Sequence, residues 1–327
     1  MIVLLTGAAG FIGLHLGRKL LEEGHTVIGV DNLNDYYDVK LKEARLAQLA
    51  QHRNFKFYRE DFSDREAMQA LMLQHQDITH IVHLGAQAGV RYSLRDPYVY
   101  IDSNVMAQVV MLECARLLPR LEHLVYASSS SVYGGNTKLP FSESDRVDQP
   151  VSLYAATKKA AELISHAYGH IYQIPTTGLR FFTVYGPWGR PDMAAYIFTR
   201  KIIAGEPIEV FNHGKMQRDF TYIDDIIAGT MAAIRRTPSS GVPTQVYNLG
   251  NHRSEDLLEF IGVIEQAVGR EAKKIFLPLQ PGDVPATYAD IELAERDLGF
   301  RPTTAITEGI PKFVAWYKDY HRIAAAA

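Results

Sequence analysis

The sequence "LLTGAAGFIGLHL" (residues 4–16) places three glycines between an apolar run and a stretch with helical spacing. Gly7, Gly10 and Gly13 lie three residues apart. Glycine lets a strand turn tightly into a helix and lets the backbone approach a ligand closely. A helix that begins here would present free N–H groups and the positive end of its dipole to a pyrophosphate. Taken alone the pattern also fits a plain glycine-rich turn, so the rest of the chain has to support the prediction of a dinucleotide-binding fold.

The first half of the chain repeats this strand-then-helix order. Apolar runs predict strands at 2–6, 26–30, 55–60, 80–85, 123–128 and 176–182. Helical spacing of apolar residues predicts helices at 11–24, 39–51, 65–74 and 103–118. Strands that are apolar on both faces and alternate with helices indicate a doubly wound, Rossmann-type α/β fold with a parallel sheet.

The second half is richer in Pro and Gly and predicts a smaller, mixed α/β domain at the C-terminal end of the chain. We expect residues 1–183 to form the dinucleotide-binding domain, with residues 218–250 packing back on it. Residues 184–217 and 251–327 would then form the substrate domain.

Composition excludes several other classes of protein. The 327 residues carry a formal net charge of −3, which gives no electrostatic footprint for nucleic acid or an acidic membrane. No apolar run approaches the roughly 20 residues of a membrane span. Cys114 is the only cysteine, so no intrachain disulfide can form, as expected in the reducing cytoplasm. The 12 histidines show no clustered ligand pattern, and no metal site is expected.

Residues at the ends of the predicted strands favour NAD as the dinucleotide. Asp31 ends the second strand, 18 residues after Gly13, where a carboxylate accepts hydrogen bonds from ribose hydroxyls. No arginine lies in the following "NLN", so a 2′-phosphate would be repelled and NADP disfavoured. The third and fourth strands end at "DF" (61–62) and "LGAQAG" (84–89). The residues expected at the cofactor are Gly7, Gly10, Phe11, Ile12, Gly13, Asp31, Asn32, Asp61, Phe62, Leu84, Ala86 and Ala88.

A reactive pair is predicted in "LYAATKKAAEL" (153–163), where Tyr154 and Lys158 share one helix face. By itself this pair also fits an ordinary helix with a packed tyrosine and a solvated lysine. The serine run "YASSSSVYG" (126–134) ends the fifth strand and opens on the same side of the sheet. A nearby cation lowers the pKa of a phenol, and a phenolate can remove a proton from an alcohol. Together with the dinucleotide site, the pair is therefore predicted to be catalytic.

Eight segments together resemble the extended short-chain dehydrogenase/reductase family of nucleotide-sugar enzymes: "TGAAGFIG", "DNLN", "LGAQAGVR", "YASSSSVYG", "YAATK", "LRFFTVYGPWGRPDM", "RDFTYIDDI" and "QPGDV". Within this family the chain is most similar to UDP-glucuronate 4-epimerases. The resemblance implies interconversion of UDP-glucuronate and UDP-galacturonate through a 4-keto intermediate, with a tightly bound NAD that is regenerated in each turnover. It also implies a homodimer formed through the helices near 104–118 and 155–172.

The resemblance assigns roles to individual residues. Tyr154 would be the base, Lys158 its electrostatic helper and ribose ligand, and Ser129 the hydroxyl on the C4 oxygen. Asn104, Tyr154 and Lys158 would also line the cofactor, with Val184 near its carboxamide. Thr183 and Arg190 would lie near the sugar carboxylate, and Arg218 at the diphosphate. The substrate residues implied are Ser129, Ser130, Ser131, Thr183, Arg190, Val210, Phe211, Arg218, Gln280 and Asp283.

Three alternatives stay open. A UDP-glucose/UDP-galactose-type epimerase has the same catalytic core, although Gln280 stands where many of those enzymes carry arginine. A UDP-glucuronate decarboxylase or a 4,6-dehydratase usually has an acidic residue after the catalytic Ser or Thr, where this chain has Ser130 and Ser131. A non-catalytic NAD-sensing module would keep the fold, but such proteins commonly lack the Tyr or the Lys.

Overall fold

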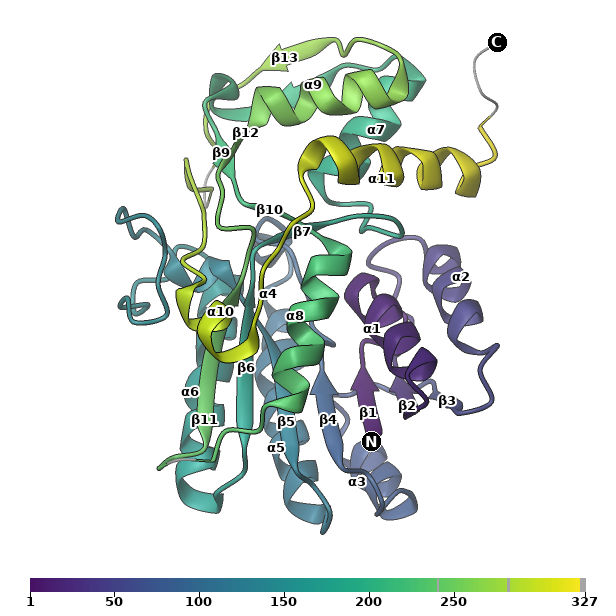
Figure 1. Cartoon of the computed structure of the whole chain (residues 1–327), viewed down its shortest axis with the longest axis vertical. Helices are drawn as coiled ribbons and strands as arrows, with labels where there is room; N and C mark the ends of the chain where they lie inside the picture. The colour runs from purple at the N-terminus through teal and green to yellow at the C-terminus, as the bar shows by residue number, and fades with distance from the viewer. Residues whose placement is uncertain (240, 281–282, 324–327) are drawn as a thin grey trace.

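The computed structural model describes residues 1–239, 241–280 and 283–323. Its centre is a seven-stranded parallel sheet in the order β11-β6-β5-β4-β1-β2-β3 (Figure 1). The strands are β1 (Ile2–Thr6), β2 (Thr26–Val30), β3 (Phe55–Tyr58), β4 (His80–His83), β5 (His123–Ser129), β6 (Thr176–Phe181) and β11 (Thr244–Leu249). The doubly wound α/β fold predicted from the sequence is confirmed.

The strand order places a topological switch at β1. This strand pairs in parallel with β2 on one side and with β4 on the other. The chain therefore builds the sheet outward through β2 and β3 and then crosses over to β4, β5 and β6. In open α/β sheets, ligands bind beyond the carboxyl ends of the strands at such a switch.

Helices cover both faces of the sheet, which is why its strands can be apolar on both sides. One layer holds α1 (Phe11–Glu22), α2 (Val39–Leu49) and α8 (Ile223–Arg235). The other holds α3 (Arg65–Gln74), α5 (Ala107–Leu117) and α6 (Leu153–Tyr172). The predicted helix at 103–118 is divided, because the chain runs from the short α4 (Pro97–Tyr100) through a π-helical segment, η2 (Ile101–Met106), into α5.

The remaining elements gather beyond the carboxyl ends of the sheet strands (Figure 1). They include the helices α7 (Ala194–Ala204), α9 (Leu257–Val268) and α11 (Ile306–Tyr320). Three short strand pairs join them: β7 (Thr183–Tyr185) with β10 (Phe220–Tyr222), β8 (Ile208–Val210) with β13 (Lys274–Phe276), and β9 (Gln217–Arg218) with β12 (Glu255–Asp256). The remaining helical segments are α10 (Glu292–Leu298), η1 (Tyr92–Leu94), η3 (Ser130–Tyr133) and η4 (Phe211–Gly214).

The segment 218–250 returns to the first half of the chain. β11 pairs with β6 at the edge of the sheet, and α8 packs on α1. We therefore propose to keep the division given above, with residues 1–183 and 218–250 in the dinucleotide-binding domain and residues 184–217 and 251–327 in the substrate domain. Within the described ranges, no helix is long and apolar enough to span a bilayer.

Candidate active site

The glycine-rich turn between β1 and α1 has no room for side chains. Gly7 has a positive φ of 70°, and its amide donates a hydrogen bond to the carbonyl of Val30 at 2.8 Å. A Cβ on Gly7 would lie 2.8 Å from the backbone nitrogen of Gly85, and one on Gly13 would overlap the carbonyl oxygen of Gly7. Gly10 caps α1 without a side chain, and the first turn of α1 carries no acidic residue. The amides at this helix end are therefore suited to a pyrophosphate.

Asp31 lies at the end of β2, next to this turn. Its carboxylate accepts hydrogen bonds from the amides of Ala9 (3.2 Å) and Leu33 (2.9 Å). Burial raises the pKa of Asp31, and these amides together with the charge of Lys42 oppose that rise. A buried carboxylate held in this way fits ribose hydroxyls and would repel a 2′-phosphate, so the residues present fit NAD.

The neighbouring strand ends complete this side of the site. Asn32 donates a hydrogen bond to Asp61 at 2.9 Å. Burial raises the pKa of Asp61, but hydrogen bonds from Ser63 and Asn32 outweigh it and lower the pKa overall. Phe62 is buried, and its ring fills the space where a side chain on Gly85 would lie. The small residues after β4 thus keep the backbone close to the glycine-rich turn.

Asn104, which the resemblance places at the cofactor, holds two elements together. Its side chain accepts a hydrogen bond from the amide of Gln87 at 2.8 Å and donates to the carbonyl of Gln87 and to the hydroxyl of Thr157, both at 3.0 Å. The loop after β4 is therefore fixed to α6, the helix that carries Tyr154.

Tyr154 and Lys158 lie on the first turns of α6, which Ser152 caps by accepting the amide of Ala155. Lys158 is buried and donates from Nζ to the carbonyl of Ala127 at 2.9 Å. Burial lowers the pKa of Lys158 to about 8, so the side chain is still mainly charged at pH 7. Lys158 is thus buried against β5 and Tyr154 is half-buried, which differs from a packed tyrosine with a solvated lysine.

The sequence predicted a lowered pKa for Tyr154, but the pKa of this phenol is raised in the folded protein. Burial raises it, whereas a hydrogen bond from Ser129 and the charge of Arg190 oppose the rise. Burial was not visible in the spacing of Tyr154 and Lys158, and its effect on the pKa of Tyr154 outweighs the hydrogen bond from Ser129 and the charge of Arg190.

The serine run divides between two tasks. Ser128 donates to Glu162 at 2.7 Å, and Glu162 forms a buried ion pair with Arg180 at 2.8 Å. Ser129 accepts the amide of Ser131 at 3.2 Å at the end of β5. Within the serine run, Ser129 is the residue whose hydroxyl opposes the rise in the pKa of Tyr154.

Arg190 lies on the loop that follows β7, which contains Thr183 and the buried Val184. It forms a two-point ion pair with Asp192, and its side chain is 23 % exposed. Tyr36 also donates to Asp192, at 3.2 Å. Arg190, whose charge acts on the pKa of Tyr154, is therefore already paired with a carboxylate.

Arg91 and Arg218 form an arginine cluster on the predicted nucleotide side of the site. Arg218, on β9, donates to the carbonyl of Pro285 at 3.1 Å. Arg91 lies over the ring of Phe211 at 4.5 Å and pairs with Asp283 at 3.0 Å. The buried Val210 precedes Phe211, and the carbonyl of Gln280 accepts the amide of Asp283 at 3.2 Å.

Arg91 was not among the predicted site residues, although it contacts two of them, Phe211 and Asp283. Its only signal in the sequence was its place at the end of "LGAQAGVR" (84–91), in the loop that follows the fourth strand.

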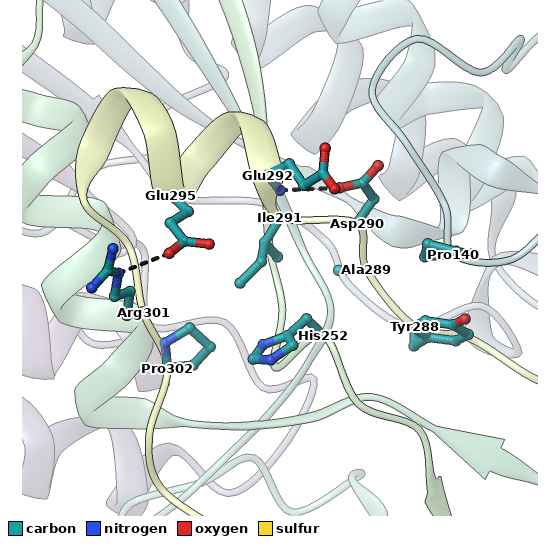
Figure 2. Close-up of a pocket in the computed structure, with 10 residues that line it drawn as sticks. All are labelled: Pro140, His252, Tyr288, Ala289, Asp290, Ile291, Glu292, Glu295, Arg301 and Pro302. Carbon is teal, nitrogen blue, oxygen red and sulfur yellow. Dashed lines mark hydrogen bonds and ion pairs between the residues drawn. The ribbon is translucent and has the colours of Figure 1, made fainter.

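A separate surface groove of about 420 Å³ lies beside α10 (Figure 2). It contains the ion pair between Glu295 and Arg301 at 2.8 Å, together with Asp290 and Glu292. Three carboxylates with one arginine would repel a nucleotide diphosphate, and none of the predicted site residues lines the groove. We assign it no part in the reaction. The part of the chain that the structure describes has no His, Cys, Asp or Glu cluster able to hold a metal ion.

Comparison with known proteins identifies the family of this chain. The model of the NAD dependent epimerase/dehydratase family matches residues 3–250. The chain belongs to this family. Its resemblance to the nucleotide-sugar enzymes of the extended short-chain dehydrogenase/reductase type is thereby confirmed.

Relatives within the epimerase/dehydratase family match along nearly the whole chain. UDP-glucuronate 4-epimerase 4 of Arabidopsis thaliana is 49 % identical over 98 % of this chain and 76 % of its own length. A probable UDP-glucuronate 4-epimerase of Rhizobium meliloti is 45 % identical over 99 % of both chains. The crystal structure of UDP-glucuronic acid 4-epimerase from Bacillus cereus, in complex with UDP-glucuronic acid and NAD, is 35 % identical and has a TM-score of 0.90 over 98 % of this chain and 100 % of that one.

Proposed function

We propose that this protein is an NAD-dependent UDP-glucuronate 4-epimerase, which interconverts UDP-glucuronate and UDP-galacturonate. The observation that carries the proposal is that Ser129 and Arg190 both act on the pKa of Tyr154, while Lys158, one helical turn further along α6, is buried against the carbonyl of Ala127 in β5. The relatives of that name, which match over nearly the full chain, support it. NAD held by the glycine-rich turn and Asp31 would supply the redox chemistry, taking up the hydride from C4 and giving it back to the opposite face of the sugar.

Tyr154 takes the proton of the C4 hydroxyl and gives it back after the 4-keto sugar has turned over. Ser129 shares that oxygen through a hydrogen bond and steadies it during the transfer. Lys158, charged at neutral pH, stabilises the phenolate and binds the cofactor ribose. The raised pKa of Tyr154 in the protein alone means that proton removal depends on further positive charge in the loaded site.

The serine run, Thr183 and Arg190 are proposed to prevent loss of the sugar carboxylate as carbon dioxide. The 4-keto intermediate of a uronate is a β-keto acid, which loses carbon dioxide readily. We propose that Ser130, Ser131 and Thr183 hold the carboxylate by hydrogen bonds and that Arg190 restrains it by charge. The uncharged serine run distinguishes this arrangement from the decarboxylase alternative.

The arginine cluster holds the nucleotide. We propose that Arg218 binds the diphosphate, that Val210 and Phe211 lie beside the uridine, and that Gln280 and Asp283 complete this side. On the cofactor side we propose contacts from Gly7, Gly10, Phe11, Ile12, Gly13, Asp31, Asn32, Asp61, Phe62, Leu84, Ala86, Ala88, Asn104 and Val184.

We further propose a cytoplasmic homodimer that packs through η2, α5 and α6. Several apolar side chains along these elements are more than two-fifths exposed in the single chain, which an interface would bury: Ile101, Met106, Leu117, Leu163, Ile171 and Tyr172. Light scattering of the native protein and of Leu163→Glu tests the dimer. The native protein should have twice the monomer mass, and the variant should be monomeric.

Proton NMR of purified protein with UDP-glucuronate and no added cofactor tests the reaction. We expect UDP-galacturonate with little UDP-pentose. Turnover of UDP-glucose but not of UDP-glucuronate would favour the neutral-sugar epimerase, and mainly UDP-pentose would favour the decarboxylase. A protein that binds NAD but turns over none of these sugars would be a sensing module.

A further inference from the structure

Arg45 on α2 joins two loops that the reaction uses separately. Its side chain is fully buried. Nη1 donates to the carbonyl of Ala9 in the glycine-rich turn at 3.3 Å and to the hydroxyl of Tyr37 at 2.6 Å. Nε and Nη2 donate to the carbonyl of Trp188 at 3.1 and 2.7 Å, and Nη2 also donates to that of Gly189 at 3.2 Å. One guanidinium thus connects the cofactor turn to the loop that carries Arg190.

The positions of these acceptors require a guanidinium group rather than the ammonium group of a lysine. Arg45 pairs with no carboxylate in the ranges 1–239, 241–280 and 283–323, so three backbone carbonyls and one phenol replace the water lost on burial. A buried charge is tolerated only when hydrogen bonds replace its hydration. The planar fork of arginine presents five donors in fixed directions, whereas lysine has one nitrogen and cannot reach acceptors on both loops.

The loop needs such an anchor because its backbone is strained. Trp188 has a φ of 65°, in the left-handed region that a bulky residue rarely adopts. The preceding carbonyl, of Pro187, accepts a hydrogen bond from His15 Nε2 of α1 at 2.9 Å. On the other side, the ring of Trp188 packs against Trp316 and Tyr320 of α11, each 5.3 Å away between ring centroids. The loop is therefore clamped between the dinucleotide-binding helices and the C-terminal helix.

The clamped segment leads directly to the charged pair above Tyr154. Arg190 and Asp192 follow Gly189, and the charges of both act on Tyr154. We infer that Arg45 is a positioning residue that couples the glycine-rich turn to this loop and so fixes Arg190 relative to the reacting sugar. The inference rests on the function proposed above for this site.

Arg45→Lys in the full-length, NAD-loaded protein tests the inference through two readouts. Hydrogen–deuterium exchange should rise about ten-fold for peptides covering 186–193 and stay unchanged for α3. With UDP-glucuronate, the share of decarboxylated product should rise at least about five-fold and kcat should fall by about 10- to 100-fold, the scale of a 1 Å misplacement. Tyr37→Phe, which removes one acceptor and leaves the charge, should change both readouts in the same direction but less.

Leu71→Ala is the matched control, since Leu71 is buried in α3 on the opposite face of the sheet. It should lower the melting temperature without changing exchange at 186–193 or the product ratio. Native exchange and native product ratio in Arg45→Lys would overturn the inference, as would an equal change of product ratio in Leu71→Ala. If the native protein fails to convert UDP-glucuronate, the proposed function fails, whereas the exchange readout still decides whether Arg45 holds the loop.

Discussion

Arg190 and Asp192 form an ion pair in which Nε lies 3.0 Å from Oδ1, on the loop beyond β7. Burial opposes the charge of Arg190, but Asp192 outweighs it and raises the pKa of the arginine. The cation expected to restrain a sugar carboxylate therefore has a partner of its own. A bound uronate has to compete with Asp192 for Arg190, and a restraint that can be exchanged is compatible with a keto sugar that must turn over in the site.

Tyr154→Phe and Lys158→Ala should each reduce kcat by at least about 100-fold, the usual scale for a positioned acid–base group. Steady-state kinetics with UDP-glucuronate measure the effect, and melting curves check that the fold survives. Near-native turnover of Tyr154→Phe would contradict the mechanism.

Asp31 should make NAD bind far better than NADP. Replacing Asp31 by Ala and Asn32 by Arg should narrow the difference, because the repulsion of a 2′-phosphate is removed and a cation is supplied. Isothermal titration with both nucleotides measures it. Asp31→Ala alone is the control, since it also removes the acceptor for the amides of Ala9 and Leu33. Equal affinity of the native protein for both nucleotides would show that Asp31 does not face the ribose.

Arg91→Ala should raise KM for the nucleotide sugar by about ten-fold with little change in kcat. Arg91 stacks on Phe211 and pairs with Asp283, both proposed to lie on the nucleotide side, so it would bind substrate and transition state equally. Arg95→Ala, an exposed arginine next to η1, is the matched control and should change neither constant. A fall in kcat without a change in KM would place Arg91 in the chemical step instead.

Buried histidines should destabilise the protein in mild acid. Burial lowers the pKa of His15 and His123 to about 4 and that of His83 to about 3, below the ordinary value of 6.5. Between pH 6.5 and about 4 the unfolded chain binds protons that the native protein does not. The free energy of unfolding should therefore fall with decreasing pH, by about 1.4 kcal/mol per pH unit for each histidine.

His123→Gln isolates one of these protons. His123 contacts the carbonyl of Ile234 and the hydroxyl of Thr177, and a glutamine can offer the same donor and acceptor. Urea unfolding at pH 6.5 and 5 should show a smaller pH dependence in the variant than in the native protein. An identical dependence would mean that His123 takes up its proton over the same pH range in the folded and the unfolded chain.

Strands and motifs that depend on neighbouring residues could be predicted from the sequence. Contacts between residues far apart in the sequence could not. Apolar runs located β1 and β2 at their observed ends, and the four-residue spacing found Tyr154 and Lys158. The strands β3 and β4 end two residues earlier than predicted, because the sequence pattern does not show where the ladder hydrogen bonds to the neighbouring strands stop. The contacts of Arg91 with Asp283 and of Arg45 with Trp188 span 192 and 143 residues, and no local pattern indicates them. Burial, which decides the pKa of Tyr154, is likewise a property of the folded chain.

The products formed from UDP-glucuronate separate this protein from the decarboxylases. Native protein should convert UDP-glucuronate to UDP-galacturonate with the C4 hydrogen retained and little UDP-pentose formed. Arg190→Ala and Arg190→His should slow epimerisation and raise the share of decarboxylated product. Losing one charge-assisted hydrogen bond of about 1.5–3 kcal/mol changes that partition by roughly 10- to 100-fold. NMR of the product mixtures measures both effects.

Asp192→Asn is the opposing variant, because it frees Arg190 from its partner carboxylate. KM for UDP-glucuronate should fall, and kcat should fall with it, since a carboxylate held more tightly by Arg190 hinders the turning of the keto sugar. Tyr36→Phe removes only the outer hydrogen bond to Asp192 and should behave almost like the native protein. Arg190→Ala and Asp192→Asn must therefore shift KM in opposite directions. A rise of KM in both variants would mean that the ion pair acts as one structural unit and that the sugar carboxylate is held by the hydroxyls of Thr183 and the serine run alone.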